Sequence, residues 1–358
     1  MGRSEKVSRI RSFDAMKTLG LFAIFWQHSV MYAFYSYDIG ERMLEVIMLI
    51  SGFLTMRNHC DDFENPTWGD SLSFMWKHMK PLYPLHLAAF VISAVTLYAG
   101  KAFTRIDAIS AVMNIFLVQS WSPFLNVAYT FNVSSWYLCA YAFCCFMTPV
   151  LICIMRKMKK WYLPFVVAVV IRLLMSYLTG RYPNTFFTFH EYVFPPVRCA
   201  EYMMGLASFP IFRFLQEKLE KFGEIKAKKA VFTAAEVLTI LLAVFITTIP
   251  EGYWYRAVCI ALTCPMIIVF AFDEGLIGKA LDNKVFRACS KYQMEFFIFH
   301  LPAIQILERL WKAPNRGVLL LVNFIGAVLL SILAKKVHGA VKSAIRKRKA
   351  EKAGGQPA

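Results

Sequence analysis

The sequence contains a series of apolar segments long enough to cross a lipid bilayer as helices. A hydrocarbon core of about 30 Å requires roughly 20 helical residues. Ten segments approach that length: residues 13–35, 42–57, 80–99, 134–155, 161–180, 194–215, 230–249, 253–272, 291–311 and 316–337. Of the 358 residues, 58% are apolar and 18% charged, more apolar sequence than one water-soluble core can bury. The sequence therefore predicts an all-α protein, a polytopic bundle of about ten transmembrane helices.

The distribution of basic residues predicts how this bundle is oriented. Lys and Arg concentrate in cytosolic loops of membrane proteins. Segments 156–160, 217–229 and 335–352 are strongly basic, as is the N-terminus. All four lie on the same side only if the short apolar segment 107–121 does not cross the membrane. We therefore expect both termini in the cytosol, with a membrane domain over residues 1–340 and a basic cytosolic tail over 341–358.

The formal net charge of +17 would indicate nucleic-acid binding in a soluble protein. Here the basic residues occupy short loops and the two ends, so we expect membrane lipids as partners and no nucleic acid. Most of the nine cysteines lie inside apolar segments. None forms a CxxC or a Cys/His pattern, so no metal site is expected.

Ionisable residues inside a membrane span are costly and are candidates for function. The first span contains Asp14, Lys17 and His28. Lys17 and His28 are eleven residues apart, close to three helical turns, so they share one face at a separation of roughly 16 Å. A lysine suits a phosphate-bearing donor, and a histidine can act as a general base. A snorkelling lysine and a packing histidine would fit the same spacing.

Six motifs, spread over residues 13–302, follow one another in a fixed order. They are Asp14-x-x-Lys17 followed after ten residues by His28, Ser51-Gly52-Phe53, Lys77 to Pro84, Gln119-Ser120-Trp121 with Ser134-Ser135-Trp136, Arg198 to Gly205, and Phe297 to Pro302. Their order and spacing resemble the integral-membrane acyltransferase-3 family, in the form without a fused extracellular domain. The ten-span expectation agrees with the architecture of that family.

The resemblance implies a multi-pass O-acyltransferase of a bacterial plasma membrane. The donor would be cytosolic acyl-CoA, by default acetyl-CoA with succinyl-CoA possible, and no permanently bound cofactor is expected. The acceptor would be a hydroxyl of a cell-surface glycan or lipid-linked sugar. His28 would be the catalytic base or would carry the acyl group itself, and Lys17, Lys77 and Lys80 would bind the donor.

Five further residues are candidates for the site. Glu201 would be a second catalytic residue that orients His28 or the acceptor. Asp14, Trp136, Arg198 and His300 would contribute to substrate binding, with Asp14 at the entrance. Structural interpretations remain open for several of them: Arg198 and Glu201 can pair on one helix face, Trp136 can be an interfacial aromatic residue, and His300 can serve helix packing.

The sequence departs from the family pattern at two cationic positions. Lys17 stands where the family usually has Arg, which keeps the charge but loses the planar two-pronged donor. The Arg-x-x-Arg motif of the third helix appears as Lys77-x-x-Lys80. An alignment on Tyr83-Pro84 would instead place His78 and Pro81 at those positions.

A secondary transporter or exporter of a glycan or small molecule is the alternative from another class of protein. Ten spans with buried charges would fit it equally well, and Arg172 and Glu236 are further intramembrane charges for which we expect partner charges elsewhere in the bundle. Transporters commonly contain repeats with paired broken helices. No such correspondence is evident between the two halves of this sequence.

Overall fold

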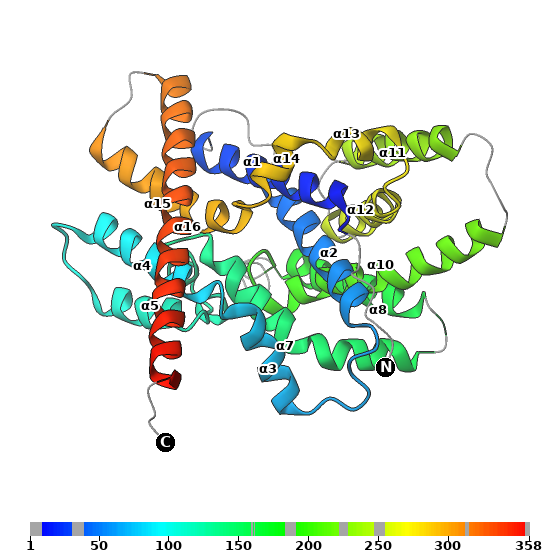
Figure 1. Cartoon of the computed structure of the whole chain (residues 1–358), viewed down its shortest axis with the longest axis horizontal. Coiled ribbons are helices and arrows are strands. Elements are labelled where there is room, and N and C mark those ends of the chain that lie inside the picture. The colour runs from blue at the N-terminus through cyan, green and yellow to red at the C-terminus, as the bar shows by residue number, and fades with distance from the viewer. Residues whose placement is uncertain are drawn as a thin grey trace.

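The computed structural model describes residues 9–30, 39–158, 160, 162–182, 191–221, 228–246, 255–311 and 315–354. These residues form helices and no strand, which confirms the all-α prediction (Figure 1). The helices are α1 (Arg11–Val30), α2 (Ile39–His59), α3 (Trp68–Met79), α4 (Tyr83–Tyr98), α5 (Arg105–Ile115), the 3-10 turn η1 (Gln119–Trp121), α6 (Leu125–Ala128), α7 (Ser135–Lys157), α8 (Leu163–Arg181), α10 (Pro195–Lys221), α11 (Lys228–Ile246), α12 (Tyr255–Ala271), α13 (Leu276–Leu281), α14 (Lys284–Cys289), α15 (Gln293–Leu310) and α16 (Arg316–Gly354).

Each of the ten predicted spans overlaps one of these helices, although residues 31–35, 161, 247–249 and 253–254 of the predictions lie outside the described residues. Within the described chain, four helices are long and apolar enough to cross a bilayer, namely α7, α8, α11 and α16 over Gly317–Arg348. The pair α3 and α4, bent by 60°, makes a fifth candidate if both belong to one span. The structure thus supports a membrane protein with several apolar helices.

Segment 107–121 forms no helix of spanning length. Helix α5 has 11 residues and is followed by η1 and α6, which are shorter still. At 1.5 Å per residue, α5 measures roughly 16 Å, about half of a hydrocarbon core. This length agrees with the expectation that 107–121 does not cross the membrane.

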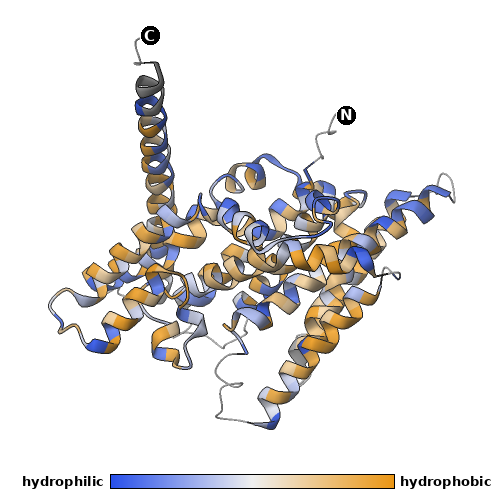
Figure 2. Cartoon of the chain, turned by 90° about the horizontal axis from the view of Figure 1, so that it is seen from below, coloured by the Kyte–Doolittle hydropathy of each residue, from blue (hydrophilic) through white to orange (hydrophobic). Residues whose placement is uncertain are grey.

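Apolar side chains point outward along several helices. On α11, Leu238, Leu241 and Phe245 are 67%, 59% and 63% exposed, and Leu321 and Leu329 on α16 are 59% and 61% exposed. Figure 2 shows hydrophobic residues along much of the length of these helices, with hydrophilic ones gathered towards the projecting end of α16. Soluble proteins rarely expose apolar patches of this extent, so lipid is the solvent that suits this surface.

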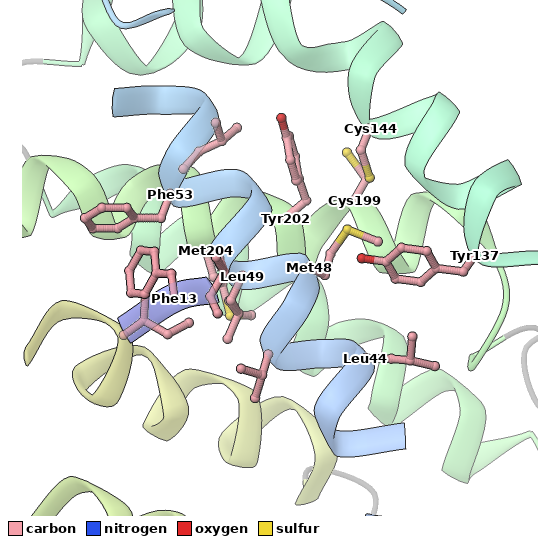
Figure 3. Packing of buried hydrophobic residues seen from close by; sticks show 14 of the residues in the cluster. Phe13, Leu44, Met48, Leu49, Phe53, Tyr137, Cys144, Cys199, Tyr202 and Met204 are labelled. Atoms are coloured by element: carbon pink, nitrogen blue, oxygen red, sulfur yellow. The ribbon is translucent and has the colours of Figure 1, made fainter. Parts of the chain in front are cut away.

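Helices α2 and α10 cross at very short range in the core. A Cβ atom on Gly52 would lie 2.2 Å from the backbone oxygen of Tyr202, and one on Gly205 would lie 2.2 Å from that of Leu49. Small residues allow helix backbones to approach this closely in membranes. Leu49, Phe53, Tyr202 and Met204 pack around the crossing (Figure 3). Two of the six sequence motifs therefore meet at this crossing.

Helix α16 continues without interruption from Arg316 to Gly354. The boundary predicted between residues 340 and 341 thus falls inside one helix. From Gly339 to Arg348 its residues are exposed, and this end projects from the rest of the chain (Figure 2). The basic residues of the predicted tail are therefore carried on a helix that extends an apolar one.

Candidate active site

Two histidines from opposite ends of the chain are paired in the helix bundle. The Nδ1 atom of His28 on α1 lies 2.8 Å from the Nε2 atom of His300 on α15. Their rings are nearly parallel, with centroids 5.1 Å apart. His300 is 1% exposed, whereas His28 is only partly buried. The structure therefore brings together two of the residues predicted from sequence.

Hydrogen bonds to the backbone determine which tautomer each histidine adopts. Nδ1 of His300 lies 2.8 Å from the carbonyl oxygen of Phe297 and 3.3 Å from that of Phe296. A carbonyl only accepts, so Nδ1 of a neutral His300 carries the proton and its Nε2 accepts. Nδ1 of His28 must then donate to that Nε2, which leaves Nε2 of His28 with a lone pair. Within the described residues, this Nε2 makes no hydrogen bond.

A proline in α15 explains how the segment around His300 is held. Pro302 has no N–H, so the carbonyl of Ile298 one turn earlier lacks its helical partner. The side-chain amide of Asn132 donates to that carbonyl at 3.0 Å. Ser134 donates to the side-chain oxygen of Asn132 at 2.9 Å and also faces the carbonyl of Phe297 at 3.5 Å. The loop before α7 therefore positions the backbone that orients His300.

The two Ser-Trp motifs contact each other through hydrogen bonds. Gln119 donates to the hydroxyl of Ser135 at 3.0 Å, and Ser120 donates to the carbonyl of Trp136 at 3.5 Å. The Ser135 hydroxyl in turn donates to the side-chain oxygen of Asn114 at 3.1 Å. These buried contacts attach η1 to the start of α7, the same helix start from which Ser134 reaches α15.

A cavity of about 300 Å³ lies beside this region, and Lys17 forms part of its wall. It is also lined by Leu21 of α1, by Tyr137 and by Phe297. Within the described residues, the Lys17 ammonium makes neither a hydrogen bond nor an ion pair, and the nearby Asp14 carboxylate is itself paired with Arg9. Because Phe297 also supplies the carbonyl that holds His300, the cavity adjoins the residue that positions the histidine pair. We call this space the Lys17 cavity.

The basic motif of α3 contributes to the Lys17 cavity through residues other than the two predicted lysines. Lys77 and Lys80 are exposed and are absent from its wall, whereas His78 and Pro81 line it. Nδ1 of His78 faces the carbonyl of Phe74 at 2.8 Å, so its Nε2 is the atom available to a ligand. The alignment on Tyr83-Pro84 is therefore the one that agrees with the cavity.

Asp14 lies at the beginning of α1 in contact with Arg9. Its carboxylate is 2.5 Å from Nε of Arg9, which is an exposed residue. The Asp14 carbonyl accepts from the side-chain amide of Gln293 at 2.6 Å, and Gln293 also lines the Lys17 cavity. Asp14 thus lies one helical turn before Lys17, outside the wall of the cavity, and its place at an entrance stays a prediction.

Glu201 belongs to a buried ion-pair network. Its two carboxylate oxygens accept from Arg172 at 3.2 Å and from Arg198 at 2.7 Å. Arg172 also pairs with Glu191 at 2.9 Å, and Arg198 lies 3.9 Å from Glu45. No described contact joins Glu201 to His28. The network confirms that Arg172 has partner charges elsewhere in the bundle.

Trp136 packs against this network. Its indole is 4% exposed, its ring lies 4.7 Å from that of Tyr192, and the guanidinium of Arg198 is 5.8 Å from it. The ring is therefore enclosed by protein, at neither an aqueous nor a lipid interface.

The partner of Glu236 differs from the expectation of an opposite charge. Its carboxylate accepts from the backbone N–H groups of Ile277 and Gly278 at 2.9 and 3.0 Å. These groups lie at the beginning of α13, where unpaired helix N–H groups can receive a carboxylate. Among the described residues, backbone donors rather than an opposite charge hold Glu236, and such donors are not visible as charges in a sequence.

A known protein family matches nearly the whole chain, including all six motifs. The family model of acyltransferase 3, described as an acyltransferase domain, matches residues 10–335. The chain belongs to the acyltransferase-3 family. Acyltransferase MdmB of Streptomyces mycarofaciens is 23% identical over 370 residues, covering 90% of this chain and 89% of the relative. No solved structure matches the chain. The protein is therefore an acyltransferase that transfers groups other than aminoacyl groups.

Proposed function

We propose that this acyltransferase moves an acyl group, by default acetyl, from acyl-CoA to a hydroxyl of a glycan or lipid-linked sugar. The observation that carries this proposal is the His28–His300 pair, because the pair leaves Nε2 of His28 with a lone pair. A partly buried imidazole of defined tautomer is suited to remove a proton from a hydroxyl.

In the proposed reaction, Nε2 of His28 takes the proton of the acceptor hydroxyl. At the same time, the oxygen of that hydroxyl attacks the carbonyl carbon of the thioester. The bond between carbon and sulfur then breaks, and the proton passes from His28 to the leaving thiolate, which gives an ester and free CoA. While His28 is protonated, its Nδ1–H remains donated to Nε2 of His300. His300 is thus a positioning residue that acts through His28, in the way that an orienting group supports a catalytic histidine.

The Lys17 cavity is the proposed donor site. The Lys17 charge, free of described ion pairs, would contact the phosphates of the donor, with Nε2 of His78 as a second contact. The exposed Lys77 and Lys80 would attract the polyanionic donor from the aqueous side. Glu201 and Arg198 would keep α2, α8 and α10 in place, and Trp136 would cover that network, so that these residues support the site at a distance.

The surrounding architecture is proposed as ten spans with both termini in the cytosol of a bacterial plasma membrane. The overlap of every predicted span with a helix and the basic end of α16 support it. Donor phosphates near Lys17 would then lie towards the cytosol, and His28 about three turns deeper.

The purified protein in lipid nanodiscs, given radiolabelled acetyl-CoA, tests the proposal. We expect slow release of labelled acetate without an acceptor and incorporation of label into added sugar acceptors. Binding of acetyl-CoA with no release or transfer under any acceptor condition would contradict the proposed donor reaction. Uptake of a glycan by sealed vesicles in the absence of acyl-CoA would instead identify a transporter.

A further inference from the structure

A second cavity lies on the other side of α1. It has a volume of about 260 Å³ and lies between α1, the α14–α15 region and α16. Hydrocarbon side chains form most of its wall, including those of Leu21, Phe22, Phe296, Phe324 and Val328. We call it the apolar cavity.

The hydroxyl groups of Thr18 and Ser331, which line the apolar cavity, are hydrogen-bonded within the protein. The Thr18 hydroxyl donates to the carbonyl of Asp14 at 2.9 Å and accepts from Gln293 at 2.8 Å. The Ser331 hydroxyl donates to the carbonyl of Ala327 one turn earlier. A polar ligand would find few partners here to replace its hydrogen bonds to water, whereas a hydrocarbon has none to lose.

The apolar cavity adjoins the histidine pair. The Phe296 ring in its wall is stacked on His300, with the planes 15° apart and the centroids at 6.1 Å. Leu21 and Gln293 line both the apolar cavity and the Lys17 cavity. The two cavities therefore lie on either side of the contact between α1 and α15, and His28 and His300 pair across that same contact.

We propose that the apolar cavity binds a hydrocarbon chain of the acceptor. The proposal rests on the proposed acyl transfer and narrows its acceptor to a hydroxyl compound with an apolar portion. A cavity of about 150 Å³ binds benzene, so 260 Å³ accommodates a chain of roughly ten carbons. Phe22 precedes His28 by six residues, roughly 9 Å along the helix. Because Phe296 in the wall is stacked on His300, a chain that fills the cavity would have its polar head near the histidine pair.

The donor is a poorer occupant of this cavity. With its phosphates at Lys17, the donor has its acyl group at the far end, near His28. Its chain would have to turn back past Phe22 to enter the cavity. An acceptor dissolved in the bilayer approaches from the side of α16, whose Ile325 and Leu329 face outward next to the lining residues Phe324 and Val328.

Photolabelling tests binding without requiring turnover. The full chain in nanodiscs is irradiated with an octyl glucoside that carries a diazirine at the end of its chain. We expect label in α16 around Phe324 to Ile332 and in α1 around Leu21, displaced by octyl glucoside but not by methyl glucoside. Label elsewhere, absence of label because a bilayer lipid keeps the probe out, or label in the cavity that octyl glucoside does not displace would each overturn the proposal.

Substitutions on adjacent faces of α16 test the consequence for transfer. Val328→Trp fills the cavity, and Leu329→Trp adds the same side chain to the outward face. With saturating acetyl-CoA and glucosides of one, four, eight and ten carbons, we expect Val328→Trp to lower the octyl-to-methyl ratio of kcat/KM at least tenfold relative to Leu329→Trp. Partition of long chains into the bilayer affects both variants equally. Val328→Phe, a smaller filler, should give an intermediate ratio.

Three results separate failure of this proposal from failure of the proposed function. Equal octyl-to-methyl ratios of kcat/KM in Val328→Trp and Leu329→Trp would overturn the proposal. It would also be overturned if Val328→Trp impaired only the use of long-chain acyl-CoA donors, measured with methyl glucoside as acceptor, because the cavity would then bind the donor. Absence of turnover by the wild type with every acyl-CoA would contradict the proposed function instead, and photolabelling would still decide what the cavity binds.

Discussion

The Nδ1 atom of His28 lies 2.8 Å from the Nε2 atom of His300, a residue 272 positions further along the chain. The backbone of α15 holds His300 through its other ring nitrogen, and Asn132 holds that stretch of α15 where Pro302 removes a donor. The tautomer of His28 is therefore determined by contacts outside its own helix. Several consequences of this arrangement are measurable.

His300→Ala is expected to lower kcat roughly ten- to a hundredfold and to leave the KM for acetyl-CoA nearly unchanged. The reason is that Nδ1 of His28 loses its acceptor while the Lys17 cavity keeps its wall. His300→Gln restores an acceptor and should recover part of the loss. Steady-state kinetics with acetyl-CoA measure both variants. A wild-type kcat for His300→Ala would show that His28 works without this partner.

Lys17→Gln is expected to raise the KM for acetyl-CoA by roughly ten- to a hundredfold, since a cation in contact with phosphate is removed. Lys77→Gln is the matched control, because Lys77 is exposed and outside the cavity wall. It should change KM by less than about threefold at physiological ionic strength. Titration of both variants with acetyl-CoA gives the comparison. A larger effect for Lys77 would move the donor site to the exposed face of α3.

Glu201→Gln should mainly lower the free energy of unfolding, because the buried guanidinium groups of Arg172 and Arg198 would both lose the negative charge that they contact. Breaking a buried ion pair costs about 3–5 kcal/mol. Glu217→Gln on the same helix removes an exposed pair with Arg213 and should leave the Tm nearly unchanged. Thermal unfolding in detergent measures both. If Glu201→Gln unfolds like the wild type but has lost kcat alone, Glu201 has a catalytic role instead.

Gly205→Ala is expected to destabilise the fold by about 1–3 kcal/mol, since the added methyl group would meet the backbone of Leu49, which cannot rotate away. Gly339→Ala provides the control, because no atom lies within 4 Å of a Cβ at that position. That change should be neutral or slightly stabilising in a helix. Chemical or thermal unfolding of both proteins decides the matter, and equal stabilities would mean that α2 and α10 do not cross this closely.

Much of the fold could be predicted from the sequence because each membrane helix is encoded by one continuous apolar segment. Each predicted span is a continuous apolar segment, and each overlaps a helix. The end of α16 was less predictable, because the helix continues past residue 337, where the apolar segment of the sequence ends and basic residues begin.

Candidate site residues could be related to one another from the sequence when they lie on one helix. Contacts between residues of different helices could not. Lys17 and His28 share α1, and their spacing places them on one face of it; that they belong to one site stays a prediction. His300 was a candidate, but its contact with His28 depends on how α15 packs. Asn132 gives no signal of its own in the sequence. Pro302 does give one, because a proline inside a helix leaves a carbonyl that some distant donor must satisfy.

The sequence did not determine which residues of the basic motif in α3 face the site, because the motif can be aligned with the family pattern in two ways. A one-residue shift exchanges Lys77 for His78, and residues next to each other on a helix point about 100° apart. The sequence alone permits both alignments. In the structure, His78 rather than Lys77 lines the Lys17 cavity, close to the 60° bend between α3 and α4.

The most direct test of the account is a comparison of wild type and His28→Ala with labelled acetyl-CoA in nanodiscs, with donor binding and transfer measured on the same samples. We predict that His28→Ala binds acetyl-CoA like the wild type and loses transfer by at least a hundredfold. Label trapped on the wild-type protein and absent from the variant would assign an acyl-histidine step to His28. Transfer by His28→Ala at the wild-type rate would contradict the account.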